Sequence, residues 1–422
     1  MKLIEVSIKE FEEYAKNHEL TNFHQTSNWA NLKKTNHWKA HYLVLKDNNE
    51  IKAAALLLKK KLPIINKYMF YSPRGFLIDY KDKSLLEEFT KLIKGFSKEN
   101  KAIFVKIDPY LNYQQRNQDG NIIKNGFNNQ DCLNNLKSLG YKHYGLGNKP
   151  TLQPRWIYTL TTKNKSLEDL LKDMEYNTRR LIKKNETLPI TTRELKKDEL
   201  QLFKDVMTHT SKRREFIDRP LSYYESMYDN LKEHIKIVIT EINFKEYITN
   251  LNNNLNKNIE LLKELQDKEE NNLVNNQKKH NNQVTELNKT ISSIEKQLVN
   301  IKSYQQKYGD KTILGGMLFI LYGNEVTSVF GGNYEELMSF YSGYTLNYEG
   351  IKYAVKNNYQ KYNFYGIDGN FKEENNMTGL HTFKKSFSGQ VEELIGEFDL
   401  IVSPISYRLY KILFKIYKLL KK

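Results

Sequence analysis

One stretch of the chain, from about Phe244 to Tyr308, contains no Gly or Pro and is rich in Asn, Lys, Glu and Gln. Because the two residues that most often end a helix are absent, the stretch predicts helix almost throughout. Its apolar residues recur three or four positions apart in two series, which are separated by the polar segment 269–282. The two series are Ile248, Leu251, Leu255, Ile259, Leu262 and Leu265, then Val284, Leu287, Ile291, Ile294, Leu298 and Ile301. Two apolar seams joined by a polar turn predict an antiparallel coiled-coil hairpin, with arms of about 40 Å at about 1.5 Å per residue.

The apolar seam alone does not decide what this arm does. A rigid spacer, a homodimer contact, a contact with a paralogue and a surface for nucleic acid could all be built on the same helical pair. The oligomeric state is therefore left open at this stage.

On both sides of the arm, short apolar strands alternate with amphipathic helices. In the first part, HYLVLK (41–46) and IKAAALLL (51–58) flank a polar turn and predict a β-hairpin. The other elements predicted there are a helix at 8–17, an aromatic strand at 68–71, a helix at 83–99 and a buried strand at 102–107. The second part repeats the order, with strands at 313–322 and 325–332, a helix near 344–357 and a strand at 361–367. The repeated order predicts an α/β (α+β) fold made of two related units.

These patterns divide the chain into four parts. The predicted boundaries are 1–155 for the first unit, 156–243 and 309–399 for the second unit, 244–308 for the inserted arm, and 400–422 for a C-terminal helix.

The C-terminal helix combines apolar residues at helical spacing with six basic residues and no acidic one. The apolar positions are Ile405, Leu409, Ile412, Leu413, Ile416, Leu419 and Leu420, and the basic ones are Arg408, Lys411, Lys415, Lys418, Lys421 and Lys422. One interpretation is an amphipathic helix that lies on an anionic membrane surface. The other is a terminal helix that packs its apolar stripe on the protein and leaves its lysines in solvent.

The charge balance points to a polyanionic partner. The 422 residues include 66 Lys and Arg against 50 Asp and Glu, a formal net charge of +16, which attracts nucleic acid, nucleotide phosphates or acidic lipid. The single cysteine excludes an intrachain disulfide framework, and no Cys/His spacing suggests a metal site. The N-terminus carries acids where a signal peptide needs an apolar run. We therefore expect a cytoplasmic protein without a metal.

Several stretches taken together resemble the Fem family of aminoacyltransferases, which build the interpeptide bridge of bacterial peptidoglycan. Their order and spacing, with the inserted helical arm, are most similar to the staphylococcal-type bridge-forming branch, and the resemblance covers essentially the whole chain. The stretches are MFYSPRGFLIDY (69–80), VKIDPYL (105–111), MEYNTRRLIKK (174–184), YTLNYEGIKYA (344–354), YNFYGIDGNF (362–371) and GLHTFKKSFSGQVEELIGEFD (379–399).

The resemblance implies two GNAT-like acyltransferase domains. It also implies transfer of an amino acid, with glycine expected and serine the alternative, from aminoacyl-tRNA to an amine of the lipid-linked peptidoglycan precursor, on its stem or bridge peptide. An ester donor is already activated, so no cofactor is expected beyond aminoacyl-tRNA as co-substrate. The chain lacks a Gln/Arg-x-x-Gly-x-Gly/Ala turn that opens a helix, which a coenzyme A-dependent enzyme would use for the pyrophosphate. A coenzyme A-dependent N-acyltransferase and a non-catalytic protein that binds tRNA or the ribosome are the alternatives.

The resemblance also suggests residues for the chemistry. Lys384 in HTFKKSF occupies the position of the family's Phe-Lys motif and could stabilise the tetrahedral oxyanion; its alternative role is a solvated surface lysine. Asp108, at the end of an apolar strand, and Glu397 are candidates for the base that deprotonates the attacking amine. For Asp108 the alternative is a turn residue bonded to nearby backbone amides.

Recognition of the precursor requires cations for its pyrophosphate and aromatic rings for its sugar and peptide. The family's cations resemble Lys33 and Arg219, and its tyrosines resemble Tyr223, with Tyr224 as a neighbouring alternative, and Tyr344. Two basic clusters could bind the tRNA backbone or could be solvated helix faces. They consist of Arg179, Arg180, Lys183 and Lys184, and of Lys212, Arg213 and Arg214.

Overall fold

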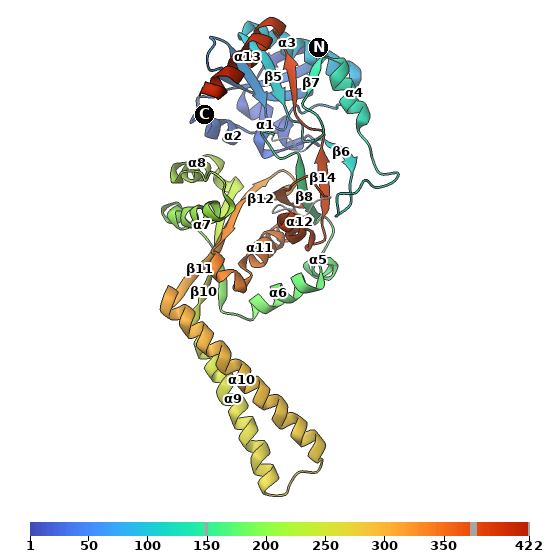
Figure 1. Cartoon of the computed structure of the whole chain (residues 1–422). Coiled ribbons are helices and arrows are strands. Elements are labelled where there is room, and N and C mark those ends of the chain that lie inside the picture. Colours follow the sequence, from blue (N-terminus) through green and yellow to red (C-terminus); the bar gives the residue numbers. More distant parts are fainter. Residues whose placement is uncertain (148–150, 372–377, 421–422) are drawn as a thin grey trace.

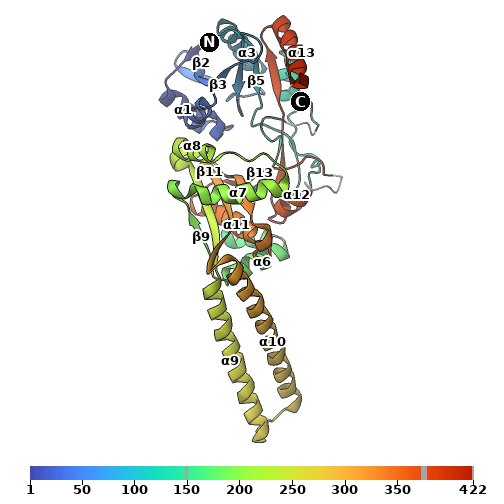
Figure 2. The ribbon, with the colours of Figure 1, turned by 60° about the vertical axis from the view of Figure 1, so that its left-hand side comes forward.

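The computed structural model describes residues 1–147, 151–371 and 378–420. Two mixed β-sheets, each flanked by helices, lie one above the other, and a long helical hairpin projects from the second (Figures 1 and 2). The predicted fold class is therefore confirmed.

The first sheet has seven strands in the order β1-β2-β3-β4-β5-β15-β7. The strands are β1 Lys2–Glu5, β2 Lys39–Asp47, β3 Glu50–Lys61, β4 Tyr68–Ser72, β5 Ala102–Ile107, β15 Phe398–Ile401 and β7 Tyr141–His143. Its helices are α1 Ile8–Asn17, α2 Ser27–Lys34, α3 Lys83–Glu99 and α4 Gln130–Ser138. The unbroken apolar run 53–58 in β3 is explained by burial on both faces, because alternate residues enter two different hydrophobic clusters.

The second sheet has eight strands in the order β6-β14-β8-β13-β12-β11-β10-β9. The strands are β6 Asn112–Gln115, β14 Gln390–Leu394, β8 Trp156–Thr161, β13 Lys361–Gly366, β12 Glu325–Asn333, β11 Lys311–Tyr322, β10 Ile235–Asn243 and β9 Ile190–Glu194. Its helices are α5 Leu167–Asp173, α6 Tyr176–Glu186, α7 Leu200–Arg214, α8 Leu221–Leu231, α11 Ser342–Lys356 and α12 Thr378–Lys385.

The repeated order seen in the sequence corresponds to a repeated topology. In the first sheet, β3 pairs with β4 antiparallel, and β4 pairs with β5 in parallel across α3. In the second sheet, β11 pairs with β12 antiparallel, and β12 pairs with β13 in parallel across α11.

The two units also exchange strands. Strand β6, from the part predicted as the first unit, pairs with β14 in the second sheet, whereas β15 returns to pair with β5 and β7 in the first sheet. The predicted boundary at residue 399 consequently falls within β15.

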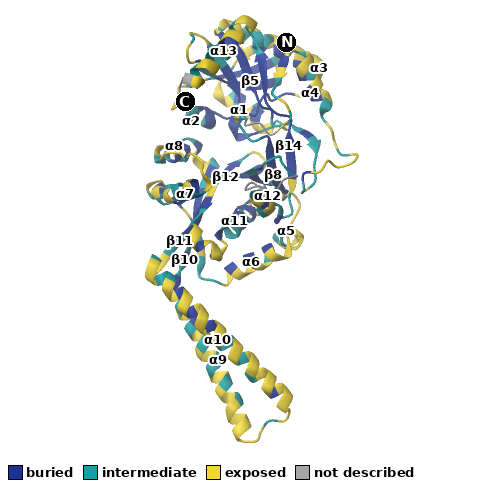
Figure 3. Cartoon of the chain, viewed as in Figure 1, coloured by how far each residue is buried: buried dark blue, intermediate teal, exposed yellow. Residues whose placement is uncertain are grey.

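The arm consists of α9 Phe244–Glu270 and α10 Gln277–Tyr308 packed side by side (Figure 2). Most buried residues of the pair lie near its base, where Leu251, Ile294 and Leu298 share a cluster with core residues such as Leu314 and Phe340. The exception is His280 near the tip, which is buried against α9 and bonds to the Leu265 carbonyl. Toward the tip the surface is mostly exposed (Figure 3). The arm is therefore anchored in the core of the second unit rather than separated from it at residue 244.

The C-terminal helix α13 Pro404–Leu420 packs on the first sheet through a face other than the predicted aliphatic stripe. Among the side chains of this helix that the structure describes, the buried ones are Tyr407 and Tyr410, whose rings lie 5.4 and 6.3 Å from Phe104 of β5. The predicted aliphatic stripe is not the packing face, because Ile405, Leu409 and other members of it are exposed. Among the described residues, no helix combines the length and the apolar content needed to cross a membrane.

Candidate active site

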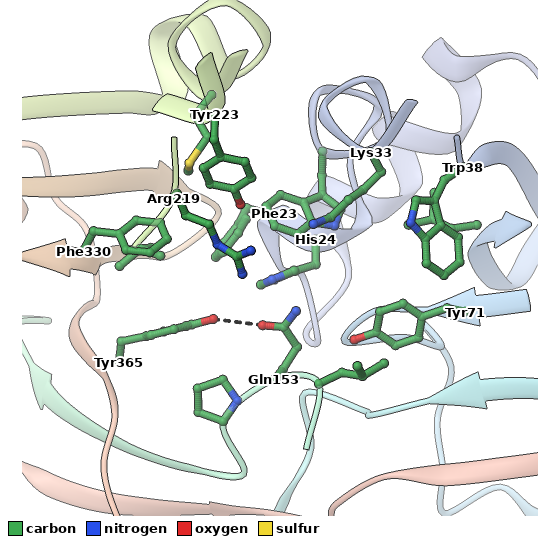
Figure 4. A pocket seen from close by; sticks show the side chains of 16 residues that line it. Phe23, His24, Lys33, Trp38, Tyr71, Gln153, Arg219, Tyr223, Phe330 and Tyr365 are labelled. Atoms are coloured by element: carbon green, nitrogen blue, oxygen red, sulfur yellow. Dashed lines mark hydrogen bonds between the residues drawn. The ribbon is translucent and has the colours of Figure 1, made fainter. Parts of the chain in front are cut away.

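A cavity of about 380 Å³ lies where the two units meet. Helix α2 and strands β3 and β4 form one side, α8, β12 and β13 form the other, and the segment 152–154 closes one wall (Figure 4). Its lining residues are Phe23, His24, Trp29, Lys33, Trp38, Leu58, Tyr71, Leu152, Gln153, Pro154, Arg219, Tyr223, Met227, Val329, Phe330 and Tyr365. Three of the predicted binding residues are thus brought together from two distant segments, Lys33 from α2 and Arg219 and Tyr223 from the start of α8.

The two cations of the cavity face each other without a counter-ion. The Lys33 amine lies 4.2 Å from the centre of the Trp29 ring, and the Arg219 guanidinium lies 5.4 Å from that of Tyr223. Burial, together with the charges of Arg219 and Lys60, lowers the pKa of Lys33 to about 8. Among the described residues that line the cavity, none is acidic. The cavity is therefore suited to an anion, such as a phosphate, that offers two oxygens to the guanidinium.

Two adjacent tyrosines on α8 have different environments. Tyr223 lines the cavity, whereas Tyr224 is fully buried and its phenol donates a hydrogen bond of 2.8 Å to Asp218. Of the two, Tyr223 is the one available to a ligand.

Asp108 lies directly behind the cavity wall. Its Oδ2 accepts a 3.0 Å hydrogen bond from the phenol of Tyr71, a lining residue, and its Oδ1 accepts a 2.8 Å bond from the backbone N–H of Arg74. Burial raises the pKa of Asp108 to about 6, although the Arg74 guanidinium opposes the rise. The alternative of a local turn is wrong, because both partners lie more than thirty residues away in sequence.

Glu397 is held in an ion pair. Its Oε1 lies 2.5 Å from the Lys106 amine, and its Oε2 accepts a 3.0 Å hydrogen bond from the backbone N–H of Leu152. This carboxylate thus fixes the cavity-lining segment that begins at Leu152, and its oxygens are already occupied.

Lys384 is buried, with 8% of its surface exposed, which excludes a solvated surface lysine. Its Nζ donates a 2.7 Å hydrogen bond to the carbonyl of Gly366, and no carboxylate among the described residues forms an ion pair with it. Burial lowers its pKa to about 7. An amine with this pKa is divided between charged and neutral forms near neutral pH.

The cavity and Lys384 meet at the end of β13. Tyr365 has a left-handed backbone (φ 65°) at an irregular position of the strand, and its phenol donates a 2.9 Å hydrogen bond to Gln153 in the cavity wall (Figure 4). The next residue, Gly366, presents its carbonyl to Lys384. One short segment therefore connects the two groups.

Tyr344 does not line the cavity. Its ring lies 4.9 Å from Phe383 and 5.8 Å from Phe387, which flank Lys384 in sequence. Tyr344 therefore lies beside the segment that carries Lys384 and not in the cavity.

The basic clusters lie on α6 and at the end of α7, and their residues form no ion pair with any described acidic residue. Helix α6 begins beside α12, because the N–H of Glu175 donates to the carbonyl of Ser386. Arg180, Lys183 and Lys184 are exposed on it, whereas Arg179 is half-buried and bonds to a carbonyl of α5. The N-terminal end of α6 thus lies beside the C-terminal end of the Lys384 helix.

Several cavity residues were not predicted. His24, Trp38, Gln153 and Tyr365 come from four segments that carry no common spacing. His24 is neutral, since burial and two nearby cations lower its pKa well below the usual value, and its Nδ1–H donates to Asn22. Only the local similarity of YNFYGIDGNF could have pointed to Tyr365.

The comparisons with known proteins show the family of the chain. The model of the FemAB family matches residues 6–415. The chain belongs to the FemAB family. The aminoacyltransferase FemA of Staphylococcus epidermidis is 33% identical over 425 residues, which cover 99% of this chain and 100% of that protein. FemA of Staphylococcus aureus is 31% identical over 417 residues, 97% of each chain.

A solved crystal structure of FemX, a further similar protein, has a TM-score of 0.80 and 27% identity, covering 97% of this chain and 99% of that one. The resemblance noted in the sequence is confirmed, and this FemAB chain is an acyltransferase enzyme. The non-catalytic alternative does not agree with this membership. Among the described residues, no cluster of His, Cys, Asp and Glu is arranged to hold a metal ion.

Proposed function

We propose that this chain transfers an amino acid from aminoacyl-tRNA to an amine of the peptidoglycan precursor, on its stem or bridge peptide. Glycine is the proposed amino acid and serine the alternative. The transfer would take place in the cytoplasm, during synthesis of the interpeptide bridge. The observation that carries the proposal is the cavity in which Lys33 and Arg219 face each other without a carboxylate. In a full-length relative of FemA, this cavity is the natural place for the diphosphate of the precursor.

The acceptor and donor would then approach from different sides. The aromatic walls of the cavity offer flat surfaces for the sugar, with Tyr71, Tyr223 and Tyr365 supplying hydroxyl groups. The donor would lie along α6, whose exposed cations match a phosphate backbone and whose Tyr176 is 74% exposed and free to stack on a base.

In the proposed reaction the acceptor amine attacks the ester carbonyl of the donor. A C–N bond forms, the C–O bond to the tRNA ribose breaks, and the amine proton passes by way of a base to the departing ribose oxygen. Lys384 would donate to the oxyanion of the tetrahedral intermediate, where a fixed donor contributes about 3–4 kcal/mol.

Asp108 is the better of the two proposed bases. Its pKa of about 6 suits proton transfer near neutral pH, and Tyr71 connects it to the cavity. Glu397 is occupied by Lys106 and Leu152, so we assign it a positioning role.

The test is a reconstituted transfer assay. Purified protein is mixed with lipid-linked precursor and one charged tRNA at a time, without ATP, and the product is weighed by mass spectrometry. We expect a mass increase of one or more glycyl residues, and none with free glycine plus uncharged tRNA. Turnover with an acyl-coenzyme A and no response to any charged tRNA would refute the proposal.

A further inference from the structure

Helix α13 presents three chemically distinct faces. At 100° per residue, Ile405, Leu409, Ile412, Ile416 and Leu419 fall within about 80° of one another. Tyr407 and Tyr410 point to the opposite side and pack on Phe104. Arg408, Lys411 and Lys415 lie between the two.

The aliphatic stripe is exposed along the length of the helix. Ile405 is 84% exposed, Ile412 60% and Leu419 66%. If the helix served only to stabilise the fold, its aliphatic residues would be buried and its tyrosines exposed. In this helix the tyrosines are buried and the aliphatic residues are exposed. The aliphatic face is therefore built to meet something other than the body of the protein.

The neighbouring β3–β4 loop extends the same surface. Leu62 and Ile65 of this loop pack in one cluster with Tyr407 and Tyr410, while Ile64 at its tip is 49% exposed. The loop is bounded by Lys61 and Lys67, both exposed. Both α13 and the adjacent β3–β4 loop thus present exposed aliphatic side chains next to basic residues.

We propose that α13 and the β3–β4 loop form a docking surface for an anionic lipid bilayer. The exposed aliphatic side chains would enter the region between headgroups and acyl chains, and Arg408 and Lys415, which form no ion pair with a described residue, would meet anionic headgroups. The proposal does not depend on the transfer reaction, because it concerns lipid and not the precursor.

Two other occupants fit less well. RNA would use the basic residues but has no use for five exposed aliphatic side chains. A second copy of the chain could pair along the 4-3-4-3 spacing, but α13 contains no acidic residue, so pairing would bring basic residues of both helices together.

The test is co-sedimentation of the full-length protein with vesicles, in the absence of precursor. Vesicles of phosphatidylglycerol and phosphatidylcholine are compared with phosphatidylcholine alone, at about 0.01 M and about 1 M salt, where the screening lengths are about 30 and 3 Å. We expect binding to the anionic vesicles at low salt and its loss at high salt.

Two variants separate the contributions. L409Q/I412Q/I416Q should reduce the vesicle partition constant at least tenfold, and R408Q/K415Q should reduce it about 25-fold, since each basic residue near the surface contributes about fivefold. The matched controls on the arm, L261Q/L273Q/V299Q and K257Q/K289Q, change equally exposed residues and should leave binding intact.

Equal vesicle binding by the wild type and both α13 variants would overturn the proposal, as would absence of binding to any vesicle. A concentration-dependent dimer that L409Q/I412Q/I416Q abolishes would assign the stripe to a second copy instead. Tight tRNA binding lost in R408Q/K415Q, without any lipid binding, would assign the surface to RNA. Unchanged thermal melting of the variants shows that the aromatic face still holds the helix.

Discussion

Replacement of Lys384 by Met should stabilise the protein near neutral pH while it slows transfer by about 10²–10³-fold. Burial lowers the Lys384 pKa to about 7, whereas an unfolded lysine titrates near 10.4. Between these values the unfolded state binds more protons, so the wild type becomes more stable as pH rises. At about 1.4 kcal/mol per unit, the buried amine costs about 4 kcal/mol at pH 7 and about 2 kcal/mol at pH 9.

Met has a similar length and no charge, so the Lys384→Met variant does not bear this cost. It does lose the hydrogen bond to the Gly366 carbonyl, about 1–3 kcal/mol with the acceptor left unsatisfied. We expect the variant to exceed the wild type by about 1–3 kcal/mol at pH 7, and the difference to fall by about 2 kcal/mol at pH 9.

The assay is denaturant unfolding of both proteins at the two pH values, with transfer rates measured in parallel. The matched control is Lys385→Met on the same helix, because its amine is partly exposed and pairs with Asp119. A stability difference that does not change from pH 7 to pH 9 would refute the titration of Lys384. Normal transfer by the folded variant would refute its catalytic role, for which a loss of about 10²–10³-fold is expected.

Three further predictions concern the cavity and the arm. Lys33→Ala and Arg219→Ala should each weaken binding of a diphosphate-linked precursor about 10- to 100-fold with little change in kcat, and titration calorimetry should show wild-type affinity declining above about pH 8, where Lys33 loses its proton. Tyr224→Phe should lower the free energy of unfolding by about 1–3 kcal/mol through loss of its hydrogen bond to Asp218, and should leave precursor affinity unchanged. Tyr223→Ala should instead act mainly on precursor affinity. If both variants weaken precursor binding equally, the assignment of Tyr223 to the cavity is contradicted. Replacing residues 259–286 by a short Gly/Ser link should leave the melting temperature unchanged, whereas removing 246–306 should lower it, because the base of the arm shares a core cluster with Leu314 and Phe340.

Elements with a strong local pattern were predictable from the sequence. The helices at 8–17 and 83–99 begin and end as expected, since amphipathic spacing and caps such as Asp82 are local signals. The hairpin arm follows from its seam in the same way. The exchange of β6 and β15 between the sheets was not predictable, because strand pairing over long sequence distances leaves no local trace.

The site was only partly predictable for a similar reason. Lys33, Arg219 and Tyr223 could be named from family-like motifs, but their convergence on one cavity depends on how α2 and α8 pack. Burial, which changes the proton affinity of Lys384 and Asp108, depends on the whole fold. The packing face of α13 was ambiguous because its aromatic and aliphatic residues both recur at helical spacing.

The end of β13 explains how one reaction could use two separate groups. The left-handed conformation of Tyr365 turns its side chain into the cavity and leaves the following carbonyl for Lys384. A non-glycine residue held in this region is strained, and such strain is retained where it sets the direction of a functional side chain. A ligand that displaces the Tyr365 phenol from Gln153 would therefore act on the same two-residue segment that holds the Lys384 amine. Occupation of the acceptor cavity and placement of the amine that faces the donor would then be linked through Tyr365 and Gly366.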